Sequence, residues 1–289
     1  MESINRLNNA KSLLKKFTRM KTIPAVATRL ISMLEDEDST FQEFEEVIKI
    51  DPTLVLRVLK LVNSSYYALR IKITSVSEAV TFIGIDNLRN LIVIDALKYL
   101  FQKNSQTQIF SRNRLWLHCA AVSICCQMIS ERIFGKKGED AFLCGILHDF
   151  GLIVEDQVVP DEFKEFYHTF SPEKHLITDH ETSIMGTDHQ IIGYLLTKAW
   201  GLSVEIQQGI KEHHESLEKI EPESLSGILQ MAEYLIFRLE FLAFPEVRTS
   251  LSPPLLIHMK KNISEYRAIA DDLPNEIQRA EEIYRLEKD

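Results

Sequence analysis

DPTLVLRVLKLV, residues Asp51–Val62, combines the start of a helix with a helical repeat of apolar residues. Asp51 is a favoured N-cap residue, and Pro52 suits the first helical position because proline lacks a backbone N–H. Apolar residues then recur on one helical face, at Leu54, Val55, Val58, Leu59 and Val62. The segment therefore predicts an amphipathic helix that packs against a hydrophobic core.

Helix signals recur on both sides of this segment. The spacings Thr40-x-x-Glu43 and Ser75-x-x-Glu78 are capping boxes ahead of apolar runs, and residues 225–239 carry a long apolar stripe. No segment shows convincing alternation of polar and apolar residues between turn residues, which a strand would require. The chain has 10 glycines, where average usage of about 7% would give about 20, so turn chemistry for a β protein is scarce. We expect an all-α fold.

Composition and charge limit the partners and the compartment. Lys and Arg number 33 against 42 Asp and Glu, and the net charge of −9 argues against broad electrostatic binding to nucleic acid or anionic membranes. Aliphatic runs such as Leu91–Ile94 fall far short of the roughly 20 residues of a spanning helix, and residues 1–17 lack the apolar segment of a secretory signal. The four cysteines form no C-x-x-C pair. We expect a cytoplasmic protein with reduced thiols and no membrane partner.

The distribution of histidine divides the chain. Residues 1–105 contain none, whereas every histidine except His258 lies in the range 112–244. The polar stretch Gln102–Gln106 is the best candidate boundary. We predict an N-terminal helical subdomain at 1–105, a histidine-bearing helical subdomain at 106–245 and a C-terminal helical extension at 246–289. Because the polar stretch is short and both subdomains carry hydrophobic faces, they should pack together rather than be joined by a flexible linker.

Histidines and carboxylates of the second subdomain follow one another in a distinctive order. The order is His118, His148, Asp149, His189, His213, His214 and Glu233. Neutral imidazole and carboxylate suit transition metals such as Fe, Mn, Zn or Ni, and a carboxylate can bridge two metals about 3.5–4 Å apart to activate water against phosphoesters. A lone histidine on an apolar helix is more often a core or surface residue, so the metal-site hypothesis depends on the order. The histidines outside it, interpreted as surface residues, are His168, His175, His180 and His258.

Motifs spread over most of the chain carry a family resemblance. They occupy Ile23–Leu30, Ile50–Tyr67, Ile73–Asn90, Leu115–His118, Leu143–Gly151, Glu181–Gly193 and Trp200–Leu202. Their residues and spacing, from Lys21 to Ala243, resemble the HDOD domain, the HD-related output domain of the bacterial HD superfamily. The resemblance implies an all-α fold in which an HD-like helical bundle packs against the N-terminal helical subdomain. It also implies a role in signal transduction, because these domains are typically regulatory modules.

The resemblance further implies a set of metal ligands. Compared with the catalytic HD phosphohydrolases and the HD-GYP cyclic-dinucleotide phosphodiesterases, the ligands would be His118, His148, Asp149, His189, His213, His214 and Glu233. Three departures from the catalytic pattern stand out. Leu152 occupies the position where relatives commonly offer a lysine to a phosphate, and Glu233 replaces the usual closing Asp. No G-Y-P tripeptide follows the two adjacent histidines, where the sequence reads Glu215-Ser-Leu217.

Two functions from different classes remain open from the sequence. The first is a regulatory module that binds a signalling protein or a small ligand, with a divalent transition metal (Fe, Mn, Zn or Ni) at a site that is retained or vestigial. The second is a metal-dependent phosphohydrolase acting on a nucleotide or cyclic dinucleotide. The three departures favour the first and lean against enzymatic activity, whereas the nearly complete set of ligands keeps the second open.

The motifs of the N-terminal subdomain also allow two interpretations. Asn63, Ser64, Tyr66 and Tyr67 could form a ligand-facing surface. Alternatively, Asn63 and Ser64 end a helix, and the tyrosines pack between the subdomains with their hydroxyls satisfied. Arg89-Asn90 could likewise tie the subdomains together through hydrogen bonds. We favour packing for all of these residues.

Overall fold

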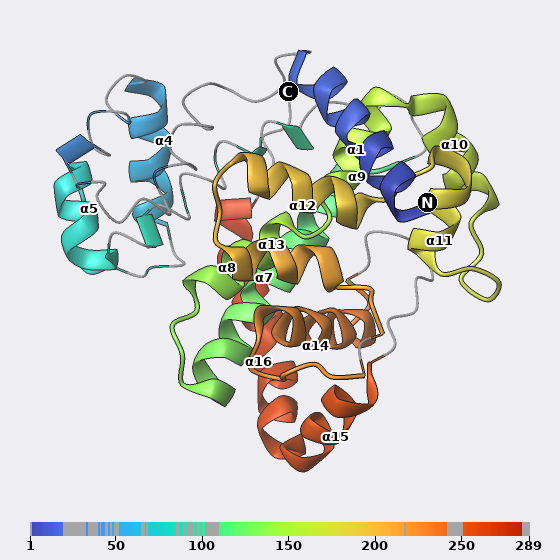
Figure 1. The fold of residues 1–289 in the computed structure, drawn as a ribbon. Helices are drawn as coiled ribbons and strands as arrows, with labels where there is room; N and C mark the ends of the chain where they lie inside the picture. Colours follow the sequence, from blue (N-terminus) through green and yellow to red (C-terminus); the bar gives the residue numbers. More distant parts are fainter. Residues whose placement is uncertain are drawn as a thin grey trace.

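A computed structural model describes most of the chain (Figure 1). The described residues are 2–19, 33, 40, 42–43, 46, 48, 52–64, 67, 69–84, 87–88, 91, 95, 97–98, 100–101, 110–216, 218–241 and 251–284. Every regular element within these ranges is a helix, which confirms the all-α fold expected from the sequence. Outside the described residues lie the motif Ile23–Leu30, the expected boundary at Gln102–Gln106, and Asp51, Tyr66, Arg89 and Asn90.

Three groups of helices follow one another along the chain. Before residue 105 lie α1 (Glu2–Arg19), α4 (Pro52–Val62) and α5 (Val76–Ile83). The histidine-bearing part contains α7 (Arg112–Phe134), α8 (Glu139–Leu147), α9 (Phe150–Val158), α10 (Pro160–Thr169), α11 (Ile177–Met185), α12 (His189–Ala199), α13 (Val204–Glu212) and α14 (Leu225–Arg238). The C-terminal part adds α15 (Pro253–Lys261) and α16 (Ile263–Tyr284).

Helix starts follow the predicted capping signals, with one shift. The Ser75 hydroxyl accepts a hydrogen bond from the Glu78 backbone N–H at 3.1 Å, as the capping box requires. The Glu78 carboxylate, however, reaches one residue further back and accepts from the Thr74 N–H at 2.7 Å. Ser224 caps α14, which carries the apolar stripe predicted at 225–239.

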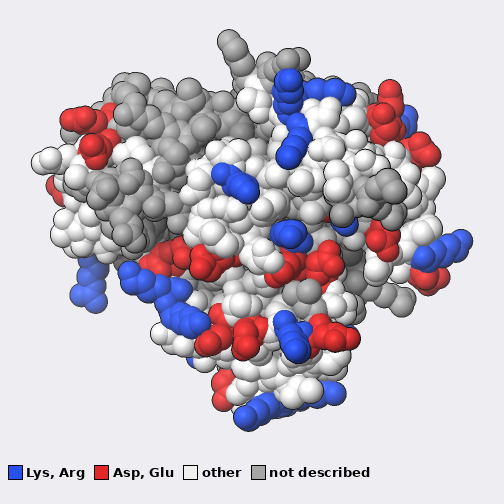
Figure 2. Space-filling model, in the orientation of Figure 1, with Lys and Arg blue, Asp and Glu red and all other residues white. Residues whose placement is uncertain are grey.

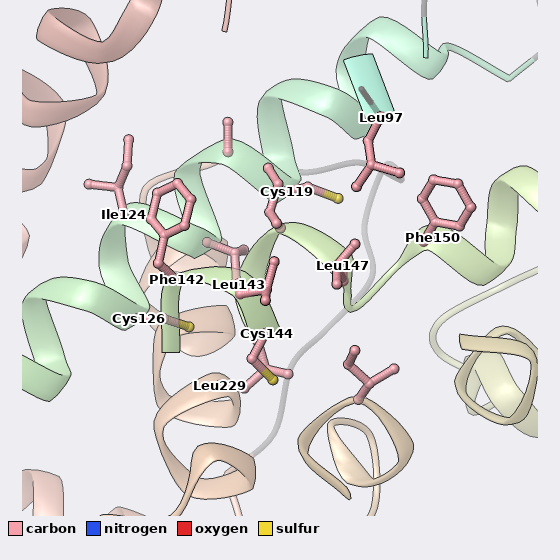
Figure 3. Close-up of a cluster of buried hydrophobic side chains, with 14 of the residues drawn as sticks. Leu97, Cys119, Ile124, Cys126, Phe142, Leu143, Cys144, Leu147, Phe150 and Leu229 are labelled. Carbon is pink, nitrogen blue, oxygen red and sulfur yellow. The ribbon is translucent and has the colours of Figure 1, made fainter. Parts of the chain in front are cut away.

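α7 is the central helix of the histidine-bearing part, because α8, α14 and α16 all pack against it. Figure 3 shows the buried side chains that fill the space between α7 and α8, among them Cys119, Phe142, Leu143 and Leu147. All four cysteines are buried and free, in agreement with their interpretation as core thiols. Residue 147 is directly followed by the His-Asp pair, so this apolar packing fixes the backbone on which the pair stands.

Described residues of the N-terminal part contact the histidine-bearing part. α1 lies across α9 and α12, whereas α4 and α5 pack against each other (Figure 1). The rings of Phe101 and Trp116 have centroids 4.9 Å apart. Arg112, at the start of α7, donates to the Leu100 carbonyl at 3.0 Å and pairs with buried Asp156 at 2.6 Å. These contacts agree with the expected packed arrangement, while the subdomain boundaries at 105 and 245 stay predictions.

The C-terminal extension is helical and packs on the histidine-bearing part. α16 lies along α7, and the buried Tyr266 hydroxyl donates to Met231 Sδ at 3.1 Å. No helix in the described ranges is both long and apolar enough to cross a membrane. On the face drawn in Figure 2, acidic and basic side chains of the described residues are interspersed.

Candidate metal centre

The predicted ligands lie where the ends and faces of six helices meet. His148 and Asp149 form the turn between α8 and α9, and His189 is the first residue of α12. His118 lies on α7 and Glu233 on α14, while His213 and His214 follow the last residue of α13. His214 is half-buried, and the other six residues are buried. The structure therefore brings all seven sequence-predicted residues into one region.

Four buried histidines have their Nδ1 atoms fixed by oxygen acceptors. The acceptors are the Phe241 carbonyl for His118 (2.7 Å), the Gly145 carbonyl for His148 (2.7 Å), the Glu181 carboxylate for His189 (2.7 Å) and the Ile210 carbonyl for His213 (2.6 Å). Because a carbonyl oxygen can only accept, Nδ1 of His118, His148 and His213 must carry the proton, and an ionised Glu181 requires the same of His189. In a neutral ring held in this way, Nε2 keeps a free lone pair. This is how metal-binding histidines are usually held by their surroundings.

The Asp149 carboxylate stands between two pairs of histidines. Its Oδ2 lies 3.2 Å from His148 Nε2 and 3.7 Å from His118 Nε2. Its Oδ1 lies 3.5 Å from the Nε2 atoms of both His189 and His213. One oxygen faces each pair, which is the arrangement that lets a carboxylate bridge two metal ions.

Two neighbouring groups of candidate ligands result. Glu233 Oε1 lies 2.9 Å from His148 Nε2 and 3.2 Å from His118 Nε2. Ligand atoms lie within 4.8 Å of one another in the group His118, His148 and Glu233, and likewise in the group Asp149, His189, His213 and His214. Cys119 forms a third such group with His148 and Asp149, although the sequence marked it only as a core thiol. Glu233 Oε1 thus lies close enough to His118 and His148 to belong to the same candidate ligand group.

Several polar atoms in this centre have no hydrogen-bonding partner that satisfies them. The Nε2 atoms of His189 and His213 lie 3.1 Å apart, and the Ile210 carbonyl fixes the His213 proton on Nδ1. When an ionised Glu181 holds the His189 proton on Nδ1 as well, two lone pairs face each other. His148 Nε2 and Glu233 Oε1 are buried 2.9 Å from each other, but neither makes a hydrogen bond of good geometry. Buried polar atoms are normally satisfied, so these residues fit a cation bound between them.

The two groups differ in the charge their histidines hold. Burial lowers the pKa of His148, but the charges of Asp149 and Glu233 outweigh burial and raise it well above its usual value. His118 likewise has a raised pKa, because Glu233 offsets the effect of burial. In the other group burial dominates and lowers the pKa values of His189, His213 and His214. The second group therefore presents neutral imidazoles, the form that binds metals.

A second layer of buried carboxyl groups lies behind His189. Glu181, which accepts from His189 Nδ1, is fully buried, as are Glu155 and Asp188. Neither oxygen of Glu155 has a hydrogen-bond partner among the described residues. Burial and the charges of Glu181 and Asp188 raise the pKa of Glu155 well above its usual value. The buried position therefore favours the neutral form of Glu155.

The substitution Glu155→Gln should stabilise the protein more at high pH than at low pH. Above the pKa of an unfolded glutamate, near 4.3, unfolding releases the Glu155 proton, so wild-type stability from this group falls as pH rises. Glutamine does not titrate and can donate to Glu181. We expect Glu155→Gln to be near neutral at pH 5 and stabilising by about 1–3 kcal/mol at pH 8 in urea unfolding.

Exposed Glu162, on α10, provides the matched control. Glu162→Gln makes the same chemical substitution at an exposed position and should leave stability within about 0.5 kcal/mol of wild type at both pH values. If the gain of Glu155→Gln did not change between pH 5 and pH 8, Glu155 would be ionised throughout.

Two glutamines that the sequence did not mark brace the turn after α13. Gln190 donates to the Lys211 carbonyl at 2.9 Å. Gln230 donates to the carbonyls of Glu212 (2.8 Å) and Glu215 (3.0 Å), on both sides of the histidine pair. The sequence signal for both was an amide residue within an otherwise apolar helical run, and the structure shows that both side chains are buried. They fix the backbone that carries His213 and His214.

Other residues marked by the sequence lie elsewhere. The Asn63 side chain bonds to the carbonyls of Leu59 (2.7 Å) and Ile73 (2.8 Å) and to the Ile73 N–H (2.8 Å), which supports the packing interpretation. Leu152 is buried in the hydrophobic core at 1% exposure. The rings of His175 and His180 stack on each other, and that of His258 stacks on Phe134, away from the ligand groups.

These features define a class of protein, all-helical and with a buried centre of histidines and carboxylates. The sequence matches the family of the HDOD domain over residues 20–216, more than half of the chain. The chain belongs to the HDOD domain family. The matched range starts after α1 and ends before α14.

Known proteins agree with the fold. A Treponema pallidum (strain Nichols) protein that bears the name "Uncharacterized protein" is 24% identical over 204 residues, which are 68% of this chain but only 38% of that protein. A Marinobacter aquaeolei VT8 structure, provisionally named a signal transduction protein, has a TM-score of 0.75 at 20% identity over 98% of this chain and 65% of its own. A Shewanella amazonensis SB2B structure, provisionally named a phosphohydrolase, has a TM-score of 0.70 at 25% identity over 94% of this chain and 98% of its own.

Proposed function

We propose that this HDOD chain is a regulatory module that binds a divalent transition metal at its buried centre. It acts by binding a signalling protein or a small ligand, without significant phosphohydrolase activity. Support for the metal comes above all from Asp149, whose two oxygens face different histidine pairs. The donors are imidazole nitrogens and carboxylate oxygens, which suit Fe, Mn, Zn or Ni.

The chain's own residues would divide the work at such a centre. His118, His148 and Glu233 would hold one metal position, and His189, His213 and His214 the other, with Asp149 shared between them. When bound, a metal supplies Lewis acidity and can activate a water molecule. Glu181 and the backbone carbonyls keep the Nδ1 protons in place, so that each Nε2 faces inward.

We propose slow or absent hydrolysis because, among the described residues, the motif position that would offer a cation to a charged transition state is aliphatic. A phosphohydrolase needs a cation where charge develops on the phosphate oxygens. Leu152, at the position where relatives offer a lysine, is an aliphatic side chain in the core. The charge of Arg6 reaches His189, but its guanidinium is already paired with Asp188. Loss of one such preorganised charge typically costs about 10²–10³ in rate.

A metal-dependent phosphohydrolase acting on a nucleotide or cyclic dinucleotide is the second candidate. The position of Asp149 between two histidine pairs favours it, since bridged metal pairs activate water against phosphoesters. Metal analysis and turnover, measured on the same preparation, separate the two functions.

Protein purified without added metal should contain Fe, Mn, Zn or Ni by elemental analysis. After loading with each ion, it should turn over cyclic dinucleotides, nucleotides and a chromogenic phosphodiester at less than about 1 s⁻¹, below ordinary enzymes. His148→Ala should lose the metal, and the control His258→Ala, outside the ligand groups, should keep it. Turnover above about 1 s⁻¹ that disappears in His148→Ala would establish the phosphohydrolase instead. If none of these ions bound to the protein or changed its stability, the proposed metal centre would be wrong.

A further inference from the structure

α1 makes two polar contacts with the turn that leads into His189. The Arg6 guanidinium pairs with the Asp188 carboxylate, across 182 positions of sequence. One helical turn further along, Asn9 donates from Nδ2 to the Gly186 carbonyl at 3.0 Å. α1 precedes the part of the chain that matches the HDOD domain family. A segment outside the family match thus holds the residues next to a candidate ligand.

Asp188 uses both of its oxygens. Oδ1 accepts from the Ile191 N–H at 3.1 Å and so caps the start of α12, while Oδ2 pairs with Arg6. The Asp188 side chain is completely buried, whereas that of Arg6 is 27% exposed. Arg6 is therefore the cation that compensates a buried carboxylate one residue before His189.

Loss of Arg6 would leave an acidic cluster without this compensation. Asp188 and Glu181 are fully buried, and the charge of each disfavours the ionised form of their buried neighbour Glu155. Removing one partner of a buried ion pair leaves an uncompensated charge, which is strongly destabilising. The least costly response is movement of the Asp188 turn toward solvent, and His189 would move with it.

The other end of α1 contacts the second ligand-bearing turn. Phe17 is buried, and its ring meets that of Phe150 edge to face, with centroids 6.4 Å apart. Phe150 directly follows Asp149. α1 therefore spans both turns that supply ligands to the His189 side of the centre, consistent with its position across α9 and α12 (Figure 1).

We propose that Arg6 is a positioning residue for the metal centre, which fixes His189 by holding Asp188 in the cap of α12. The proposal rests on the proposed metal-binding function. Arg6 touches none of the candidate ligands and acts through Asp188. Metal affinity should therefore depend on a side chain outside the region that matches the family.

Zn²⁺ affinity, measured by competition with a chromogenic chelator, tests this role in the full chain. Arg6→Ala should weaken Zn²⁺ binding at least tenfold, whereas Lys11→Ala, which removes an exposed charge from the same helix, should change it less than twofold. The double substitution Arg6→Ala with Asp188→Asn should recover most of the affinity, because asparagine caps a helix without a buried charge. Circular dichroism confirms that each variant is folded at the temperature of the titration.

Amide exchange of metal-free protein gives a second readout. The Ile191 amide donates to Asp188, so in Arg6→Ala it should exchange at least tenfold faster than in Lys11→Ala. If Arg6→Ala matched Lys11→Ala in Zn²⁺ affinity, or lost affinity that Asp188→Asn did not restore, the positioning role would be wrong. If the wild-type protein bound no Zn²⁺, the proposed function would fail, and the Ile191 exchange rate alone would decide whether Arg6 fixes this turn.

Discussion

The substitution Gly151→Ala is expected to destabilise the protein by about 3 kcal/mol or more and to abolish metal binding. A Cβ atom at this position would lie 2.2 Å from the His189 carbonyl oxygen and 2.6 Å from His189 Cα. These are backbone atoms, so no side-chain rotation relieves the clash. α9 must then move away from the start of α12, and Asp149 separates from His189. Urea unfolding and elemental analysis measure the two effects.

Gly193→Ala is the matched control for this substitution. Its Cβ would meet Ile210 Cγ2 at 2.9 Å, a single side-chain methyl group rather than backbone, so a shift of a few tenths of an ångström relieves the contact. We expect a loss of about 1 kcal/mol and retained metal binding. Equal losses of stability in the two variants, with metal still bound to Gly151→Ala, would mean that the close approach of α9 and α12 does not set the geometry of the centre.

Local sequence signals were sufficient for the helices and for the order of the ligands. The apolar repeat of Asp51–Val62 predicted α4, and the stripe at 225–239 predicted α14, because both signals lie within a single helix. The seven candidate ligands were found from the order of their motifs. Tertiary packing then brings these seven residues into one region. Their proximity is a property of the fold, separate from their order in the sequence, and it fits a common role.

Long-range partners could not be predicted in this way. Arg6 and Asp188 are 182 positions apart, and nothing near Arg6 distinguishes it from the exposed basic residues of the same helix. Glu155 lies on an apolar helix without any motif, and its burial beside Glu181 depends on the packing of α9 against α12. Glu181 was visible only as part of a family motif. Its bond to His189 appears once both residues are placed.

Local geometry also changed one detail that the sequence pattern suggested. The box Ser75-x-x-Glu78 predicts that Glu78 returns to the N–H of Ser75 itself. Its carboxylate instead accepts from the N–H and hydroxyl of Thr74, at 2.7 and 3.0 Å. A glutamate side chain can reach either donor, and the extended backbone at Ser75 decides between them. Such choices depend on backbone angles that residue spacing does not specify.

The substitution Asp149→Asn should weaken metal binding at both positions of the centre by at least about 100-fold. Each Asp149 oxygen faces one histidine pair, and an amide offers a single neutral oxygen in their place. Loss of residues that only support ligands typically costs 10–100-fold in affinity, so loss of a shared ligand should cost more. Zn²⁺ stoichiometry and affinity, from elemental analysis and chelator competition, give the result.

Glu233→Gln distinguishes a shared carboxylate from one that serves a single metal. Glu233 Oε1 lies near His118 and His148 only, so this variant should lose the metal of that position and keep the other. Asp161→Asn, at an exposed position on α10, controls for the loss of a carboxylate charge and should bind as wild type does. If Asp149→Asn lost one metal and kept the other, as Glu233→Gln is expected to do, its carboxylate would not bridge two positions. The centre would then hold a single metal beside a pair of histidines. Activation of a water molecule between two metal ions would have no structural basis in such a centre.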